Sequence, residues 1–173
     1  MMKTVKKYIK AVSLMNEWIG RIDAVVIIPL VLITIYEVVL RKFFNSPTVW
    51  VFETSNQLYA LFFMMGLGFA LLHGCHVNVD VFYRYFSPKG KAIMDIFGFI
   101  IFFFPFCIIV FWKGILFAAQ SWQMLEVSQS VFRVPLYPIK TIIPLMAITL
   151  LLQGTVVFIK RVYLVFEGKE LDA

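Results

Sequence analysis

The sequence predicts an all-helical integral membrane protein with four transmembrane helices and an N-terminal amphipathic helix. Hydrophobic residues make up 61% of the 173 residues and the mean hydropathy is +0.87, which leaves too little polar surface to cover a soluble fold. Four apolar stretches are each long enough for a membrane-spanning helix of about 20 residues. Because these stretches occupy most of the chain, we expect a single membrane domain over residues 1–173.

Residues 3–20 are predicted to form an amphipathic helix that lies in the membrane interface. Apolar side chains recur there at helical spacing, and the lysines fall largely at the other positions. Since the segment is short, a solvated basic tail is the alternative. We do not expect a removable signal peptide, because lysines interrupt the segment and no small-residue cleavage site follows it. The apolar positions are Val5, Tyr8, Ile9, Val12, Met15 and Ile19, and the lysines are Lys3, Lys6, Lys7 and Lys10.

Four membrane spans follow this segment. They are predicted over residues 22–40, 50–72, 92–112 and 136–159. Pro29, Pro105 and Pro144 lie inside spans, where each removes a helix hydrogen bond and can kink the axis. The residues after Trp112 remain compatible with a helix, so the third span either is long and tilted or emerges as an interfacial helix.

The basic residues predict the orientation of the spans. The formal net charge is +6, but lysines and arginines cluster beside the spans, where they meet lipid headgroups, so we do not expect nucleic-acid binding. Eleven of them fall on one side of the membrane and five on the other, which places both termini in the cytoplasm. The first group is Lys3, Lys6, Lys7, Lys10, Arg21, Arg84, Lys89, Lys91, Lys160, Arg161 and Lys169, and the second is Arg41, Lys42, Lys113, Arg133 and Lys140.

The second span begins with a polar face. Trp50 is expected at the membrane interface, and Glu53 just beneath it needs a partner, because a carboxylate in the membrane is expensive. We expect Glu53 to pair with Arg41 or Lys42 across the adjacent turn. A proton or ion pathway is the alternative, but no other span carries an acidic group near the midplane to continue it. The face consists of Glu53, Asn56 and Gln57.

Small residues continue along the same span. Gly66, Ala70 and Gly74 recur at every fourth position, which allows another helix to approach closely. Together with the polar face at its start, this ridge predicts that the second span packs against protein rather than lipid.

Histidines are too few for a metal centre. His73 and His76 lie at the predicted cytoplasmic end of the second span, followed by Asp80. Two ligands from one helical turn leave a metal site incomplete, and a bis-histidine haem needs histidines on facing helices. We therefore favour a cluster of His76 and Asp80 that shapes the cytoplasmic turn. The sequence carries no nucleophile–base set, phosphate loop or facing carboxylate pair, so we expect neither an enzyme nor a cofactor.

Several motifs occur in a characteristic order along the four spans. They are the basic turn with Arg41 and Asn45, the pair Trp50-x-x-Glu53, the glycine-bearing second span, the Gly74-Cys75-His76-Val77-Asn78-Val79-Asp80 segment, and a Ser-x-x-x-x-Glu-x-Ser-x-Ser run followed by Pro-x-x-Pro from Ser121 to Pro138. In this order they make the chain resemble the small membrane subunit, Q, of bacterial tripartite ATP-independent periplasmic (TRAP) transporters.

The resemblance implies a non-enzymatic subunit in the bacterial inner membrane. Its partners would be a larger M subunit, which carries the sodium and substrate sites, and a periplasmic substrate-binding protein, P. Transport would be driven by the sodium gradient, and the substrates of such systems are mostly organic acids. The polar face and ridge of the second span would then contact the large subunit or the core of this bundle. An unrelated four-helix protein, either a small channel or the membrane anchor of a redox complex, is the alternative.

The two loops predicted on the periplasmic side carry polar side chains suited to docking a soluble protein. We expect these side chains to lie close together above the membrane and to touch the binding protein. They are Arg41, Lys42 and Asn45 in the first loop and Gln123, Glu126 and Arg133 in the second.

Overall fold

The computed structural model describes residues 2–74 and 86–168, and the named secondary-structure elements of these residues are all helices. Four helices are long and apolar enough to cross a membrane, which confirms the predicted fold class. They are α1 (Met2–Phe43), α2 (Val51–Leu72), a continuous helix made of α4 (Pro88–Gly98), η1 (Phe99–Phe103) and α5 (Phe104–Gln123), and α6 (Tyr137–Glu167).

The first helix is uninterrupted, whereas two separate elements, over residues 3–20 and 22–40, were expected. The junction is helical, and Glu17 and Arg21 form an ion pair of 3.0 Å across it on the same face. At 1.5 Å per residue its 42 residues extend about 63 Å, roughly twice the thickness of the hydrocarbon core. The apolar face of its N-terminal half packs on α6, where Ile9 and Val12 form a buried cluster with Val156.

The third membrane-spanning helix is longer than the predicted span of residues 92–112. It begins with Ser87 as its cap, whose hydroxyl oxygen accepts a hydrogen bond from the Gly90 amide at 3.2 Å. The π-helical turn η1 ends two residues before Pro105, which has no amide hydrogen to contribute to the regular ladder of α-helical hydrogen bonds. The helix then continues to Gln123, so the segment after Trp112 belongs to one long helix.

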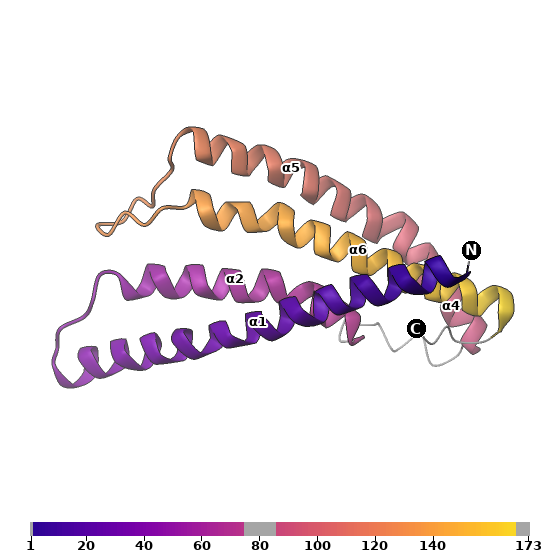
Figure 1. The fold of residues 1–173 in the computed structure, drawn as a ribbon. Coiled ribbons are helices and arrows are strands. Elements are labelled where there is room, and N and C mark those ends of the chain that lie inside the picture. The colour runs from indigo at the N-terminus through magenta and orange to yellow at the C-terminus, as the bar shows by residue number, and fades with distance from the viewer. Residues whose placement is uncertain (1, 75–85, 169–173) are drawn as a thin grey trace.

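Two helical hairpins make up the molecule: α1 pairs with α2, and α5 pairs with α6 (Figure 1). Helix α6 joins the hairpins, because it contacts α2, α4 and α1 in addition to α5. The connections 44–50 and 124–136 lie at one end of the molecule, which we call the loop end (Figure 1). The start of α1, the start of α4 and the end of α6 lie at the opposite end, which we call the termini end.

The core lies along α6, and the outer faces of the hairpins are apolar and exposed. Leu150 of α6 forms a buried cluster with Leu71 of α2 and Cys107 of α5. Outward-facing side chains such as Leu32 on α1 and Phe102 in η1 are 61% and 73% exposed. A surface of this kind suits lipid or another membrane protein rather than water.

Candidate functional site: polar contacts that join helices and loops

At the loop end, Glu53 in the first turn of α2 binds the loop between α5 and α6. The Ser128 hydroxyl oxygen lies 2.8 Å from both carboxylate oxygens of Glu53, and 3.0 Å from the hydroxyl oxygen of Ser130. A hydroxyl has one proton, so Ser128 donates to one carboxylate oxygen at a time while the other stays within reach. We call this arrangement the carboxylate–serine latch, and it holds the second hairpin to the first.

The loop presents these serines because its backbone is folded on itself. Val127 and Pro135 form an isolated antiparallel bridge, and the Ser128 amide donates to the Val134 carbonyl at 2.8 Å. Arg133 closes the turn with a φ of +51° and donates its amide to the Ser130 carbonyl at 3.2 Å. The segment is therefore a structured loop.

A cavity of about 280 Å³ lies beside the latch, between the start of α2 and the loop. Its walls combine polar groups of α2, including Asn56, with Leu136 and Ile139 at the start of α6. Gln57 donates its side-chain amide to the Pro135 carbonyl at 2.9 Å, which gives α2 a second bond to the loop. The predicted polar face of the second span is therefore directed at this chain's own loop.

Glu53 does not form the expected ion pair with Arg41 or Lys42 in the structure. Arg41 binds Glu37 at 2.8 Å instead, one turn away on α1. Glu37 also accepts hydrogen bonds from the amide and the hydroxyl of Thr48, so it ties the 44–50 connection to α1. The nearer carboxylate holds the arginine, and the serines satisfy Glu53.

The loop between α5 and α6 carries a carboxylate of its own, Glu126, which is bound by a lysine of α6. Lys140 forms an ion pair with Glu126, and its ammonium nitrogen lies 4.0 Å from the centre of the Phe117 ring of α5. The hydrogen bond from Lys140 lowers the pKa of the Glu126 carboxyl below its ordinary value of 4.5. This pair is therefore present at neutral pH, and its contribution is lost only as the pH falls through that lowered pKa.

Deeper in the bundle, polar side chains of α1 are buried against α2 and α6. The Asn16 amide donates to the Gln153 side-chain oxygen of α6 at 3.1 Å, and both residues are almost wholly buried. Asp23 is 6% exposed and lies against Gly66 of α2. The pairing of Asn16 with Gln153 was not predicted. Asn16 falls on the apolar face of the predicted amphipathic helix, which indicates that it is buried but does not identify its partner.

The small residues of α2 are used within this chain. A Cβ atom on Gly66 would lie 3.3 Å from an Asp23 carboxylate oxygen, and one on Gly68 would lie 2.4 Å from the Asn16 oxygen. Gly68 was not part of the predicted ridge, whereas Gly74, which was, has a φ of +68° and open space around its Cβ position. Gly74 therefore lets the chain leave the helix in a left-handed conformation. Ala70 is half-buried.

At the termini end, an ion pair links neighbouring helices: Arg161 of α6 binds Asp95 of α4 at 2.9 Å. Nearer the middle of the molecule, the imidazole of His73, which follows α2, lies 3.4 Å from the carboxylate of Glu17 on α1. His76 and Asp80, the predicted cluster of the cytoplasmic turn, lie outside the described residues. Among the described residues, no group of three histidine, cysteine or acidic side chains is arranged to hold a metal ion.

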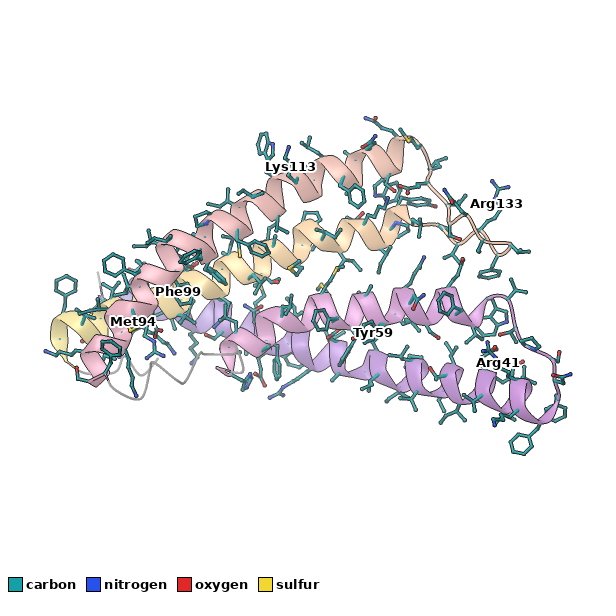
Figure 2. The ribbon with its side chains drawn as sticks, turned by 180° about the vertical axis from the view of Figure 1, so that it is seen from behind. Arg41, Tyr59, Met94, Phe99, Lys113 and Arg133 are labelled. Atoms are coloured by element: carbon teal, nitrogen blue, oxygen red, sulfur yellow. The ribbon has the colours of Figure 1, made fainter. Side chains whose placement is uncertain are left out.

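The six predicted docking residues all lie at the loop end, and Figure 2 shows Arg41 and Arg133 there on different hairpins. Arg41 is bound to Glu37 of α1, and Glu126 is bound to Lys140 of α6, so both charges are paired within this chain. The side chains of Lys42, Asn45, Gln123 and Arg133 are exposed.

These features define a class: a helical membrane protein whose polar side chains join its own helices and loops. The chain belongs to the family described as tripartite ATP-independent periplasmic transporters, DctQ component, because the family's model matches residues 30–163. It is thus a component of a TRAP transporter. A comparison with curated proteins finds no significant match.

Proposed function

We propose that this chain is the non-catalytic scaffold of a sodium-driven transporter, binding a large membrane subunit that carries the transport site. The observation that carries the proposal is the pairing of its polar side chains. Asn16 with Gln153 inside the bundle and Glu53 with Ser128 at the loop end fix helices and loops to one another. Such bonds make a rigid body, and the exposed apolar faces of α1 and α5 offer it a surface for a membrane partner.

Membership of the family supports the remainder of the proposed function. A periplasmic binding protein delivers an organic acid, and the sodium gradient drives its import through the large subunit. In this arrangement the present chain contacts the large subunit within the membrane and the binding protein at the loop end. It takes no part in the chemistry of the substrate.

Purification and uptake measurements test this role. The full chain is coexpressed with the many-span membrane protein of its transporter, and uptake is measured in liposomes with the binding protein and a sodium gradient. The two membrane proteins should purify together, and uptake should disappear without this chain even when the large protein is inserted. Normal uptake in its absence would overturn the proposal, as would ion conduction by the chain alone.

The proposed orientation places both termini in the cytoplasm and the loop end in the periplasm, as the distribution of basic residues favours. Val131 is 88% exposed in the loop between α5 and α6, and Phe166 is 83% exposed near the end of α6. In intact cells, cysteine at Val131 should react with a membrane-impermeant thiol reagent, and cysteine at Phe166 should react only after permeabilisation. The reverse pattern would contradict the orientation.

A further inference from the structure

The largest cavity we describe lies at the termini end, between the first two turns of α1 and the last turns of α6. Its volume is about 410 Å³. Met2 and Val5 form one wall, and Phe158, Val162 and Phe166 form the other. A groove lined in this way fits a hydrocarbon chain and gains nothing from contact with water.

The cavity lies where α6 leaves the apolar part of its sequence. Phe158 and Ile159 end the apolar run of α6, and Lys160 and Arg161 follow immediately. Basic residues in this position mark the level of the lipid headgroups. The groove therefore begins at the hydrocarbon level at Phe158, passes the headgroup level at Lys160 and Arg161, and continues outwards to Phe166.

Positive charge lies along the α1 side of the groove. Lys3, Lys6, Lys7 and Lys10 fall within one stripe of the α1 surface, since positions three, four and seven apart share a helix face. Lys6 lies at the edge of this stripe and lines the groove. Lys89 of α4 also reaches this end, because its side chain lies 3.8 Å from the Cβ position of Gly168.

One acidic residue, Glu167, lines the same cavity. Its carboxylate interacts with the hydroxyl of Tyr163, on the α6 wall. The opposite wall, with Lys6, carries the positive charge, so an anion is attracted to the α1 side of the groove and repelled from the α6 side.

We infer that this groove binds an anionic phospholipid, with one acyl chain along Phe158 and Val162 and the headgroup phosphate at Lys6 and Lys3. The apolar wall and the lysine stripe fit the two parts of such a lipid, and the charge selects an anionic headgroup over a zwitterionic one. The bound lipid would fill the gap between α1 and α6 and so brace the termini end as the latch braces the loop end. This inference does not depend on the identity of the transported substrate.

Competition between two lipids tests the inference. The full chain is released from nanodiscs that contain equal amounts of phosphatidylglycerol and phosphatidylcholine, and the retained lipid is identified by native mass spectrometry. Phosphatidylglycerol should be retained preferentially by the unmodified chain. The preference should fall about fivefold for each lysine removed in Lys3→Gln and Lys6→Gln, since each lysine near a surface contributes by about that factor.

Three variants separate the groove from general charge effects. Lys42→Gln and Lys113→Gln together remove the same charge outside the groove and should leave the preference unchanged. Glu167→Gln should raise the preference, and Val162→Trp should abolish retention of both lipids by filling the groove. The helical circular dichroism of every variant should match that of the unmodified chain. An unchanged preference in the Lys3 and Lys6 variants, or unchanged retention in Val162→Trp, would overturn the inference.

A segment of the large subunit is the rival occupant of the groove. A photo-crosslinking amino acid placed at Phe166 in the assembled transporter distinguishes the two. Crosslinks to phospholipid support the inference, and crosslinks to the large subunit overturn it.

Discussion

At the scale of single residues, the stability of the loop end depends on how its carboxylates are satisfied. Glu53 is partly buried, so each hydroxyl that reaches it replaces a lost bond to solvent. Ser128 supplies that bond from a position 75 residues away in the sequence. The hydrogen bond between Glu53 and Ser128 therefore joins the two hairpins.

The first prediction concerns this latch. Ser128→Ala should lower the free energy of unfolding of the purified chain by about 1–2 kcal/mol, because it removes a hydrogen bond to a charged group. Glu53→Gln should have a similar effect, and the double variant should lose less than the sum of the two. Thermal unfolding in detergent measures each value. Gln129→Ala, at an exposed position in the same loop, is the control, and additive losses would show that Glu53 and Ser128 act independently.

The second prediction concerns the buried amide pair. Asn16→Leu or Gln153→Leu alone should destabilise the chain by about 1–3 kcal/mol, because each leaves a buried polar partner unsatisfied. The double variant removes both partners and should recover much of that loss. The free energy of unfolding of the three variants is measured under the same detergent conditions. If the double variant loses as much as the two single variants together, Asn16 and Gln153 do not stabilise the chain as a pair.

Which residues become partners was only partly predictable. The position of Glu53 in the span predicted that it needs a partner, but it did not predict which residue the partner is. Arg41 and Lys42 were the nearest basic residues in the sequence, yet Glu37 lies four positions before Arg41 on the same helix and holds it without any tertiary contact. Asn16 and Gln153 meet because α1 and α6 cross, which no local pattern reveals.

At the scale of elements, glycine and phenylalanine set how closely the helices approach. The ring of Phe69 on α2 lies against Gly20 of α1, where an added Cβ atom would be 2.2 Å from the ring and 2.7 Å from the Phe69 Cβ. The ring of Phe103 in η1 occupies the corresponding space at Gly154 of α6. Small residues at such crossings allow van der Waals contact between helices that lipid does not drive together.

The third prediction tests this close approach. Gly20→Ala should destabilise the contact between α1 and α2 by about 1–3 kcal/mol, because Phe69 cannot move its own Cβ away by changing rotamer. Gly98→Ala is the matched control, since a Cβ atom there meets nothing within 4 Å, and it should be neutral or slightly stabilising. Unfolding in detergent compares the two variants. Equal stability of the two variants would show that the close approach of α1 and α2 at Gly20 does not contribute to the stability of the chain.

The existence and order of the elements were predictable, and their ends were less so. Hydropathy locates the apolar part of a helix, whereas the helix itself continues wherever side chains remain compatible with it. For this reason α6 runs beyond residue 159 to Glu167, and the third helix beyond residue 112 to Gln123. A helix that is amphipathic first and apolar later, as α1 is, appears in the sequence as two elements.

At the scale of the whole molecule, the described chain is held at both ends and in the middle. The latch and the Glu126–Lys140 pair act at the loop end, Asn16 and Gln153 act within the bundle, and Asp95 with Arg161 acts at the termini end. Composition predicted the membrane class, because a chain this apolar has no soluble alternative. The central position of α6 depends on which faces of the helices pack against one another, and no local sequence pattern predicts this.

The last prediction concerns the loop end as a docking surface for the binding protein. Exposed charges at the rim of an interface act mainly on the rate of association, so Arg41→Glu and Arg133→Glu should slow the encounter with the substrate-loaded binding protein. Uptake should fall when the binding protein is limiting and should recover toward normal at saturation. Arg133→Lys keeps the charge and should behave like the unmodified chain. Equal loss at every concentration of binding protein would indicate a damaged scaffold, and unchanged uptake would show that these arginines take no part in docking.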